Sequence, residues 1–400
     1  MKNADVAIVS LYPPPASKHA GRSGVASYTA NLAKGLVDAG AAVDVVCPYD
    51  AEDEPIREHD GSVYIRRTFR RGATALVDAV AAAKGTRAPV VHVQFELFLY
   101  GGTLALLGLM PALAALRNAG RRVVVTPHQV VDPRTVNKQF VRTHRVRSPS
   151  FAARAGINLV QNAIGRLADA VVVHEPSFRK QISGSAVIRH GVESRQRLDT
   201  AKSRKELGLT SRPVVLCFGF VAPYKGLEAA LSAAEQSNRF QLVVAGGEHP
   251  RLANGSAPGY TAELKQRWPD AARFTGYVPE TDIARWFSAT DLALFPYPQP
   301  FASSGALALA LSYGTPVLVS EAVARCIEAP PQLTVPIEPK ALADELDRAV
   351  SDPERMRSIR DACAQLTAGR SWTAVAKAHL ELYEEVLNAH GPVSGRLRAG

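Results

Sequence analysis

The 400-residue sequence is poor in cysteine and has no long hydrophobic run. Its four scattered cysteines show no CxxC spacing, which argues against a zinc site and a disulfide framework and fits a reducing cytoplasm. The longest apolar helix candidate, Leu104–Leu116, is interrupted by Pro111 and falls short of the roughly 20 residues that span a bilayer. The apolar run Val6–Leu11 is too short for a secretory signal core. We therefore expect a cytoplasmic protein without a transmembrane segment.

Acidic residues are missing from residues 133–168, although the whole chain carries a formal net charge of +10. The basic residues of this stretch alternate with apolar ones and are Arg134, Lys138, Arg142, Arg145, Arg147, Arg154 and Arg166. Such a segment can lie on an anionic membrane or receive a phosphorylated acceptor, whereas a solvated basic helix face is the alternative. Nucleic-acid-binding motifs are absent, and aromatic residues are too few for base stacking. We expect no nucleic acid partner and consider peripheral contact of residues 134–166 with the inner membrane face.

Short apolar strands alternate with amphipathic helices in both halves of the chain, which is typical of parallel sheets with crossover helices. Strands are predicted at Val6–Leu11, Val43–Cys47, Val90–Val93, Val123–Thr126, Ala170–Val173, Val214–Phe218, Gln241–Ala245, Ala272–Phe274, Leu292–Phe295 and Pro316–Val319. Helices are expected at Thr29–Ala39 and at Trp372–Leu387, and the polar residues 193–211 are expected to link two domains. The predicted fold class is α/β, with two Rossmann-like doubly wound domains that face each other across a cleft.

Two common phosphate-binding fingerprints are missing from these domains. The first strand is followed by Tyr12-Pro13-Pro14-Pro15 instead of GxGxxG, which argues against a dinucleotide oxidoreductase. The segment from Gly219 to Lys225 lacks the second glycine and the hydroxyl residue of a P-loop. We therefore exclude both a nicotinamide-type site and a P-loop NTPase.

A different anion site is predicted in the second half. The apolar strand Val214–Phe218 ends in a glycine turn that presents Lys225 just before a helix, at the carboxyl end of a strand where open α/β sheets bind ligands. Ser303 and Ser304 precede another helix, whose first backbone N–H groups and dipole favour an anion. An ordinary helix cap and a surface lysine are the alternatives. Taken together, the two segments predict a clamp for a diphosphate.

Several short segments, in order along nearly the whole chain, resemble the GT-B glycosyltransferases of family 4. They are Gly21-Arg22-Ser23-Gly24-Val25, His128, Arg189-His190-Gly191-Val192, Lys225-Gly226, Gly276-Tyr277-Val278 and Tyr313-Gly314-Thr315-Pro316-Val317. The resemblance implies retaining transfer of a hexose from a nucleotide sugar. It implies an acceptor-binding domain at 1–195 and a nucleotide-sugar-binding domain at 196–371. It also implies that a C-terminal helix at about 372–390 packs back on the first domain.

The resemblance and the local patterns together give a set of candidate site residues. Those expected to bind the donor are Gly24, Gly219, Lys225, Gly226, Tyr277, Val278, Ser303, Ser304 and Gly305. His128 follows a strand and is expected to line the reaction centre, Glu96 to orient the acceptor hydroxyl, and Lys225 to stabilise the leaving diphosphate. For His128 and Glu96, an ordinary loop histidine and a solvated carboxylate are the alternatives. No DxD motif occurs at a strand end, so no obligatory metal or other cofactor is expected beside the GDP- or UDP-hexose donor.

The chain departs from the family pattern at two places. Where the family carries an arginine near the lysine loop, this chain has Phe220, Val221 and Ala222, and where it carries two glutamates, this chain has Phe301 and Leu309. We expect a hexosyltransferase acting on a glycan, a lipid-linked or a small-molecule acceptor. The alternatives are a degenerate nucleotide-sugar-binding or assembly protein without catalysis, and a sugar-nucleotide epimerase or hydrolase on the same scaffold.

Overall fold

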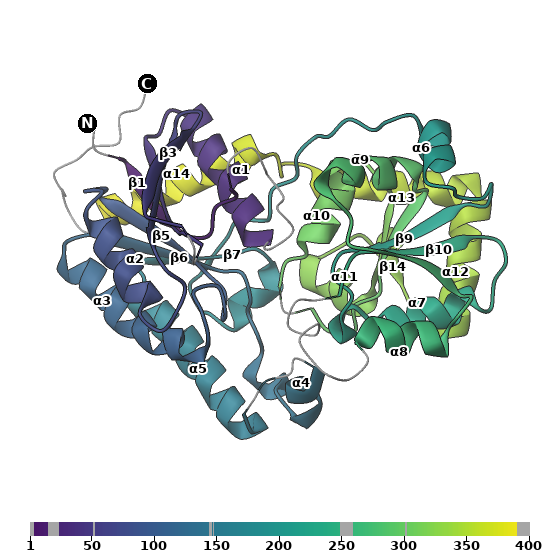
Figure 1. Cartoon of the computed structure of the whole chain (residues 1–400), viewed down its shortest axis with the longest axis horizontal. Helices are drawn as coiled ribbons and strands as arrows, with labels where there is room; N and C mark the ends of the chain where they lie inside the picture. The colour runs from purple at the N-terminus through teal and green to yellow at the C-terminus, as the bar shows by residue number, and fades with distance from the viewer. Residues whose placement is uncertain are drawn as a thin grey trace.

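The computed structural model describes residues 4–14, 24–50, 53–143, 146, 148–248, 259–300 and 302–389. Six residues or segments discussed above lie outside these ranges: Pro15, Gly21-Arg22-Ser23, Arg145, Arg147, Phe301 and the chain end after residue 389. The described chain forms two α/β lobes, the first drawn in purple to teal and the second in green to yellow (Figure 1).

The first lobe is built on an eight-stranded sheet in the order β3-β4-β2-β1-β5-β6-β7-β8. Its strands are β1 (Val6–Val9), β2 (Val43–Pro48), β3 (Ile56–Asp60), β4 (Val63–Phe69), β5 (Val90–Phe95), β6 (Arg122–Pro127), β7 (Ala170–Val173) and β8 (Ala186–Val187). Only the β3–β4 pair is antiparallel among the described pairings of this sheet. The helices are α1 (Gly24–Asp38), α2 (Ala75–Lys84), η1 (Thr103–Gly108), α3 (Leu109–Asn118), η2 (Pro133–Thr135), α4 (Lys138–Thr143), α5 (Ser150–Leu167) and η3 (Pro176–Lys180).

The second lobe is built on a six-stranded parallel sheet in the order β11-β10-β9-β12-β13-β14. Its strands are β9 (Val214–Phe218), β10 (Gln241–Ala245), β11 (Ala272–Gly276), β12 (Leu292–Phe295), β13 (Val317–Ser320) and β14 (Thr334–Val335). The helices are α6 (Thr200–Glu206), η4 (Pro223–Lys225), α7 (Leu227–Ala234), α8 (Tyr260–Arg267), α9 (Glu280–Ala289), α10 (Gly305–Ser312), α11 (Glu321–Ile327), η5 (Pro331–Leu333), α12 (Pro339–Ser351) and α13 (Pro353–Thr367).

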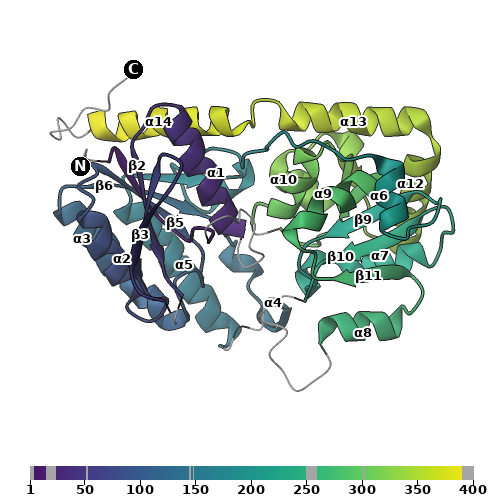
Figure 2. The same cartoon turned by 45° about the horizontal axis from the view of Figure 1, so that its top comes forward.

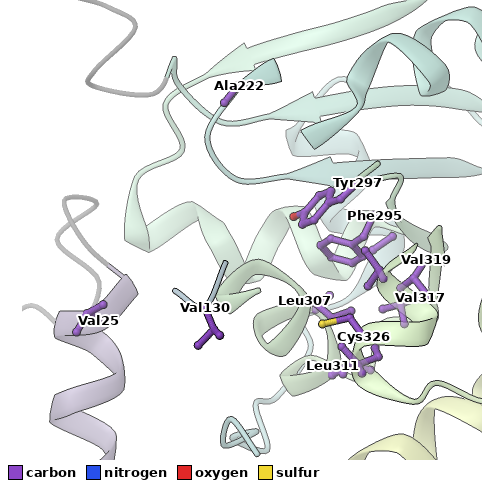
Figure 3. Packing of buried hydrophobic residues seen from close by; sticks show 14 of the residues in the cluster. Val25, Val130, Ala222, Phe295, Tyr297, Leu307, Leu311, Val317, Val319 and Cys326 are labelled. Atoms are coloured by element: carbon purple, nitrogen blue, oxygen red, sulfur yellow. The ribbon is translucent and has the colours of Figure 1, made fainter. Parts of the chain in front are cut away.

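The central strands are buried on both faces, which explains why they read as continuous apolar runs rather than as alternating ones. All residues of β1, β5 and β12 are buried, because crossover helices cover both faces of a parallel sheet. In the close view of Figure 3, Phe295 of β12 packs beside Val317 and Val319 of β13, with Leu307 and Leu311 of α10 on them. The predicted α/β class with two doubly wound domains is confirmed.

Some local predictions differ from the structure. The first strand ends at Val9 rather than at Leu11. The β3–β4 hairpin was not predicted, since β3 is mostly exposed and polar and shows no apolar run. Within the predicted linker 193–211 lies α6, whose first turn is capped by Asp199. Pro111 does not break α3, because it stands in the first helical turn, where no hydrogen bond from its nitrogen is needed.

The two lobes are joined along one side by the last two helices. Figure 2 shows α13 lying over the second lobe and α14 (Trp372–Asn388) continuing in the same direction over the first. There α14 packs on α1, where Gly35 faces Trp372 and Ala376. Arg370, just before α14, accepts a backbone hydrogen bond from Val192 at 2.7 Å. The chain therefore crosses between the lobes twice, once near Val192 and once near Arg370, and the two crossing segments lie side by side.

Candidate functional site

The lysine predicted at the end of β9 lies in a tight turn of the second lobe. Lys225 is the last residue of η4, and Gly226 caps α7 in the left-handed conformation, with φ of 65°. A Cβ on Gly226 would stand 2.2 Å from the carbonyl oxygen of Pro296. Two features therefore require glycine at this position: the left-handed backbone angle and the nearby carbonyl of Pro296. This close approach brings the lysine turn against the segment that follows β12.

Lys225 starts a chain of polar contacts that ends at α10. Its Nζ donates a hydrogen bond to the hydroxyl of Tyr297 at 2.6 Å, and that hydroxyl lies 3.2 Å from Oγ of Ser304. Ser304 is the N-cap of α10, and its Oγ accepts from the backbone N–H of Leu307 at 3.2 Å. Burial lowers the pKa of Lys225 below its usual 10.5. The predicted lysine and serine segments are thus brought together, with Tyr297 between them.

Gly219 lies at the same place, between Lys225 and the first turn of α10. A Cβ on Gly219 would be 3.7 Å from Nζ of Lys225 and 3.5 Å from Cβ of Ala306. A small pocket here is lined by the end of β9, by Lys225 and by Tyr297. Gly305, the first residue of α10, is exposed. The ends of β9 and β12 and the N-terminus of α10 therefore converge on one point, where backbone N–H groups and a lysine can hold an anion.

The remaining predicted donor residues, Tyr277, Val278 and Gly24, make no described contact with Lys225. Tyr277 follows β11 with 57 % of its surface exposed, and its backbone lies against Gly247, whereas Val278 is buried. Gly24 opens α1 in the first lobe, and a Cβ there would meet no described atom within 4 Å. Leu309, one position where the family carries a glutamate, packs on the core from α10.

On the first lobe, His128 is held by a hydrogen-bond network that runs to α14. Its Nε2 lies 2.7 Å from Oε1 of Gln94. Since an amide oxygen only accepts, Nε2 carries the proton and Nδ1 is left with its lone pair. The amide nitrogen of Gln94 lies 3.3 Å from Nε2 of His92, whose Nδ1 is 2.6 Å from the hydroxyl of Tyr383 on α14. Gln94 therefore selects one tautomer of His128.

His128 also belongs to a cluster of rings centred on Tyr28 of α1. The ring centroid of Tyr28 lies 4.9 Å from those of His128 and His174, and 5.2 Å from those of His190 and Trp372. Burial is the main cause that lowers the pKa of His128 well below its usual 6.5, and neighbouring histidines lower it further. The imidazole is consequently neutral at physiological pH. His190, which belongs to the Arg189-His190-Gly191-Val192 segment, is part of this packing.

The two lobes meet at the loop before α10. Ala302 forms an isolated antiparallel bridge with Gln129, the residue after His128. The side-chain amide of Gln129 donates to Oε1 of Glu96 at 3.1 Å. The loop that leads to Ser304 therefore touches the loop after β6 that carries His128, and Gln129 of that loop contacts Glu96 at the end of β5. Candidate residues from opposite halves of the sequence are assembled at one junction.

Ser303 also makes a contact between the lobes, with a partner that the sequence did not predict. Its hydroxyl donates to Oε1 of Glu175, the second residue after β7, at 2.6 Å. The sequence predicted that Ser303 and Ser304 both face a diphosphate, whereas here only Ser304 belongs to the chain of contacts from Lys225. Glu175, Tyr297 and Gln94 were missed by the sequence interpretation. Their one common signal is that each lies within or just after the carboxyl end of a parallel strand.

The structure defines a two-domain α/β protein in which Lys225 and the N-terminus of α10 converge in the second domain, next to the histidine loop of the first. A family model described as "Glycosyl transferase 4-like domain" matches residues 23–192, and one described as "Glycosyl transferases group 1" matches residues 199–365. The chain therefore belongs to the GT-B glycosyltransferases with family 4-like domains. This confirms the resemblance seen in the sequence.

Individual relatives are similar over about half of the chain. A GDP-mannose:glycolipid 4-beta-D-mannosyltransferase from Xanthomonas campestris is 30 % identical over 195 residues, covering 46 % of this chain and 52 % of that protein. D-inositol 3-phosphate glycosyltransferase 2 from Catenulispora acidiphila is 28 % identical over 200 residues, covering 46 % of each. The chain thus spans about half the length of the curated relatives it matches.

Solved structures share the whole fold. Sucrose-phosphate synthase from Thermosynechococcus elongatus gives a TM-score of 0.74 at 23 % identity, covering 96 % of this chain and 99 % of that one. HepE from Anabaena, solved in complex with UDP-glucose, gives 0.66 at 15 % identity, covering 95 % and 99 %. At these identities the likeness establishes the GT-B fold alone. In the part of the chain that the structure describes, no helix is both long and apolar enough to cross a bilayer.

Proposed function

We propose that this protein transfers a hexose from a GDP- or UDP-linked sugar to a hydroxyl group of a glycan, a lipid-linked or a small-molecule acceptor. The observation that carries the proposal is the chain of contacts Lys225–Tyr297–Ser304 at the N-terminus of α10, with the neighbouring Ala302 bridged to the loop that carries His128. Residues 196–371 would hold the donor and residues 1–195 the acceptor. Family membership supports this division of labour.

The second domain supplies what the departing nucleotide diphosphate needs. As the bond between sugar and phosphate breaks, negative charge grows on the diphosphate, and a lysine with a helix N-terminus stabilises it. We assign these roles to Lys225, Ser304 and the first N–H groups of α10, with Gly219 and Gly226 allowing the close packing. The exposed ring of Tyr277, beside Val278, offers a surface for the nucleoside.

The first domain supplies the groups around the reacting sugar. His128, neutral and with Nδ1 unprotonated, is proposed to accept a hydrogen bond at the reaction centre. Glu96 is proposed to orient the acceptor hydroxyl, and Gly24 to let the backbone of α1 approach the donor. Ser303 and Gly305 complete the turn that faces them. No step in this proposal requires a metal ion.

Retention of the anomeric configuration is part of the proposal and is supported by the family resemblance. One relative is named a 4-beta-D-mannosyltransferase, so the configuration of the product is the observation that decides. NMR of the glycoside formed from an α-linked donor tests it: an α-product supports retention, and a β-product contradicts it.

The donor site is tested by thermal shift of the purified protein with UDP, GDP, ADP and dTDP. A ligand that binds only the folded state raises the melting temperature. We expect nucleotides of one base to bind preferentially. Lys225→Ala should lower the affinity for that nucleotide by roughly 10- to 100-fold, the usual cost of losing a hydrogen bond to a charged group. Lys340→Ala is the matched control, since its side chain is 76 % exposed on α12 of the same domain.

Other outcomes separate the alternatives. Nucleotide release from a nucleotide sugar without any acceptor product would favour a hydrolase, and interconversion of the sugar an epimerase. Binding without turnover would favour a non-catalytic nucleotide-sugar-binding protein. No shift with any of the four nucleotides or their sugar conjugates would contradict the proposal as a whole.

We also propose that residues 134–166 contact an anionic membrane or a lipid-linked acceptor. Phe151 and Leu159 of α5 are 75 % and 59 % exposed, and Arg154 is exposed between them. Positions eight apart lie on one face of a helix. This face of α5 thus combines apolar side chains with a basic environment free of acidic residues in the sequence.

A further inference from the structure

Glu175 is a buried carboxylate at the junction of the two lobes, and none of the roles proposed above uses it. It directly follows His174 at the end of β7 and caps η3, which packs against α11 of the second lobe. Only 3 % of Glu175 is exposed. Its Oε1 accepts the hydrogen bond from Ser303 at 2.6 Å, the residue next to the N-cap of α10.

The surroundings of Glu175 do not neutralise it fully. Its Oε2 is buried and has no hydrogen-bond partner among the described residues. The nearest cation is Arg189, with Nη1 at 3.8 Å, but that guanidinium donates to the carbonyl of Ile327 and to Glu328 instead. Burial is the main cause that raises the pKa of Glu175 to about 7; the hydrogen bond from Ser303 and the charges of Arg370 and Arg189 lower it in part.

A carboxylate held in this way lowers the stability of the folded protein. Burial of an incompletely paired charge lowers stability, and an apolar residue of similar size would serve packing equally well. Such groups are enriched at functional sites. When Glu175 is ionised, the hydrogen bond from Ser303 is charge-assisted and therefore strong, and it crosses from one domain to the other.

We propose that Glu175 is a positioning residue: through Ser303 it fixes the turn that opens α10, and so ties the first domain to the donor site of the second. The turn has only one residue between the Gln129–Ala302 bridge and the N-cap Ser304. Glu175 holds that residue. Without the bond, the turn keeps its capping contact with Leu307 but loses its attachment to the acceptor domain. The proposal rests on the proposed function, since it assigns the donor to this turn.

The test measures binding of UDP-glucose and GDP-mannose, with UDP and GDP as references, to the full chain by calorimetry. We expect Glu175→Ala and Ser303→Ala each to lower the affinity for the preferred nucleotide sugar by about 10- to 100-fold, as for a lost hydrogen bond to a charged group. The double variant should be no weaker than either single one, because both remove the same bond. Glu175→Gln should restore most of the affinity, since its amide oxygen accepts the same bond.

Glu328→Gln is the matched control, because Glu328 also contacts Arg189 but is 61 % exposed and does not touch Ser303. Additive losses in the double variant, or an unchanged affinity in Glu175→Ala, would overturn the positioning role. If Glu175→Ala does not fold, an unimpaired Ser303→Ala would overturn it equally. Failure of the wild type to bind any of the four probes contradicts the proposed function instead, and the two failures are thereby distinguished.

Discussion

At the scale of single residues, the site depends on polar groups whose partners come from distant parts of the sequence. Lys225 is held by Tyr297, and Ser303 by Glu175. His128 takes its tautomer from Gln94. Each pairing removes a freedom that the isolated side chain would have, so these side chains are oriented before a ligand arrives. Preorganisation of this kind lowers the cost of binding and of reaction.

The tautomer of His128 yields a prediction about pH. Gln94→Glu would replace a neutral acceptor by a carboxylate, which favours the protonated imidazole and raises the pKa of His128 from its lowered value. We expect the wild type to keep its donor turnover down to mildly acidic pH. The variant should lose turnover as pH falls through the raised pKa, because the protonated ring no longer offers an acceptor.

The measurement is nucleotide release from the preferred donor between pH 5 and 8, chosen as about one unit and a half on each side of the usual histidine pKa. Gln236→Glu is the control, since that side chain is exposed after α7 and donates to the carbonyl of Ser232. Superimposable pH profiles of wild type and Gln94→Glu would show that the ring is not used as an acceptor.

At the scale of elements, helix α14 is attached to the first lobe by close contact with α1. A Cβ on Gly35 would lie 2.9 Å from the carbonyl oxygen of Trp372 and 3.1 Å from Cβ of Ala376. The two helices therefore approach at their backbones, which only a glycine permits at that position. Through Tyr383, the same helix also reaches the network behind His128.

Gly35→Ala is expected to destabilise the protein although alanine is the better helix former. Overpacking costs about 1–3 kcal/mol, which exceeds the gain of about 0.5–1 kcal/mol from helix propensity. The control is Gly156→Ala on α5, where a Cβ meets no described atom within 4 Å and the propensity gain should appear alone. Urea denaturation of both variants measures the two effects, and equal midpoints would contradict the tight α1–α14 contact.

The outer face of α5 leads to a prediction on membranes. Phe151→Asp combined with Leu159→Asp removes exposed apolar area and adds negative charge, and both changes weaken attachment to an anionic surface. We expect the wild type to float with vesicles that contain anionic phospholipid and the double variant to remain unbound. Leu198→Asp, 49 % exposed and outside this segment, should float like the wild type. Equal flotation of all three proteins would contradict contact through α5.

At the scale of the whole molecule, buried histidines make stability depend on pH. Burial lowers the pKa of His174 to about 3 and of His379 to about 4, and that of His92 and His128 well below 6.5. The unfolded chain therefore binds more protons than the folded one below the unfolded pKa of about 6.5. Stability is full above that pH and is lost as pH falls toward the folded values. Glu175, with its raised pKa, acts in the opposite direction but is a single group.

We expect the free energy of unfolding to fall by several kcal/mol between pH 7 and pH 4, because each unit by which a histidine pKa is lowered contributes ~1.4 kcal/mol. Urea unfolding at a series of pH values measures this. His379→Leu should reduce the slope, whereas His59→Gln, at an exposed position of β3, should not. A stability that stays level over this range would mean that the histidines are solvated.

The sequence by itself determined the fold class, since continuous apolar strands separated by amphipathic helices fit little else than parallel sheets. It also indicated Lys225 and Ser304 as one site, because strand ends and helix starts gather at the carboxyl edge of such a sheet. These signals are local. The β3–β4 hairpin has no such signal, because its edge strand β3 is polar and exposed.

Only the tertiary structure showed which distant residues complete the site. Nothing in the local sequence around Glu175 indicates that it bonds Ser303, 128 positions away. Likewise, Gln94 reads as one buried polar residue of a strand until the neighbouring strand places His128 beside it. Periodicity records which face of an element is buried, whereas partnership between side chains depends on how strands are ordered and how the two lobes meet. That order is set by packing of the whole chain.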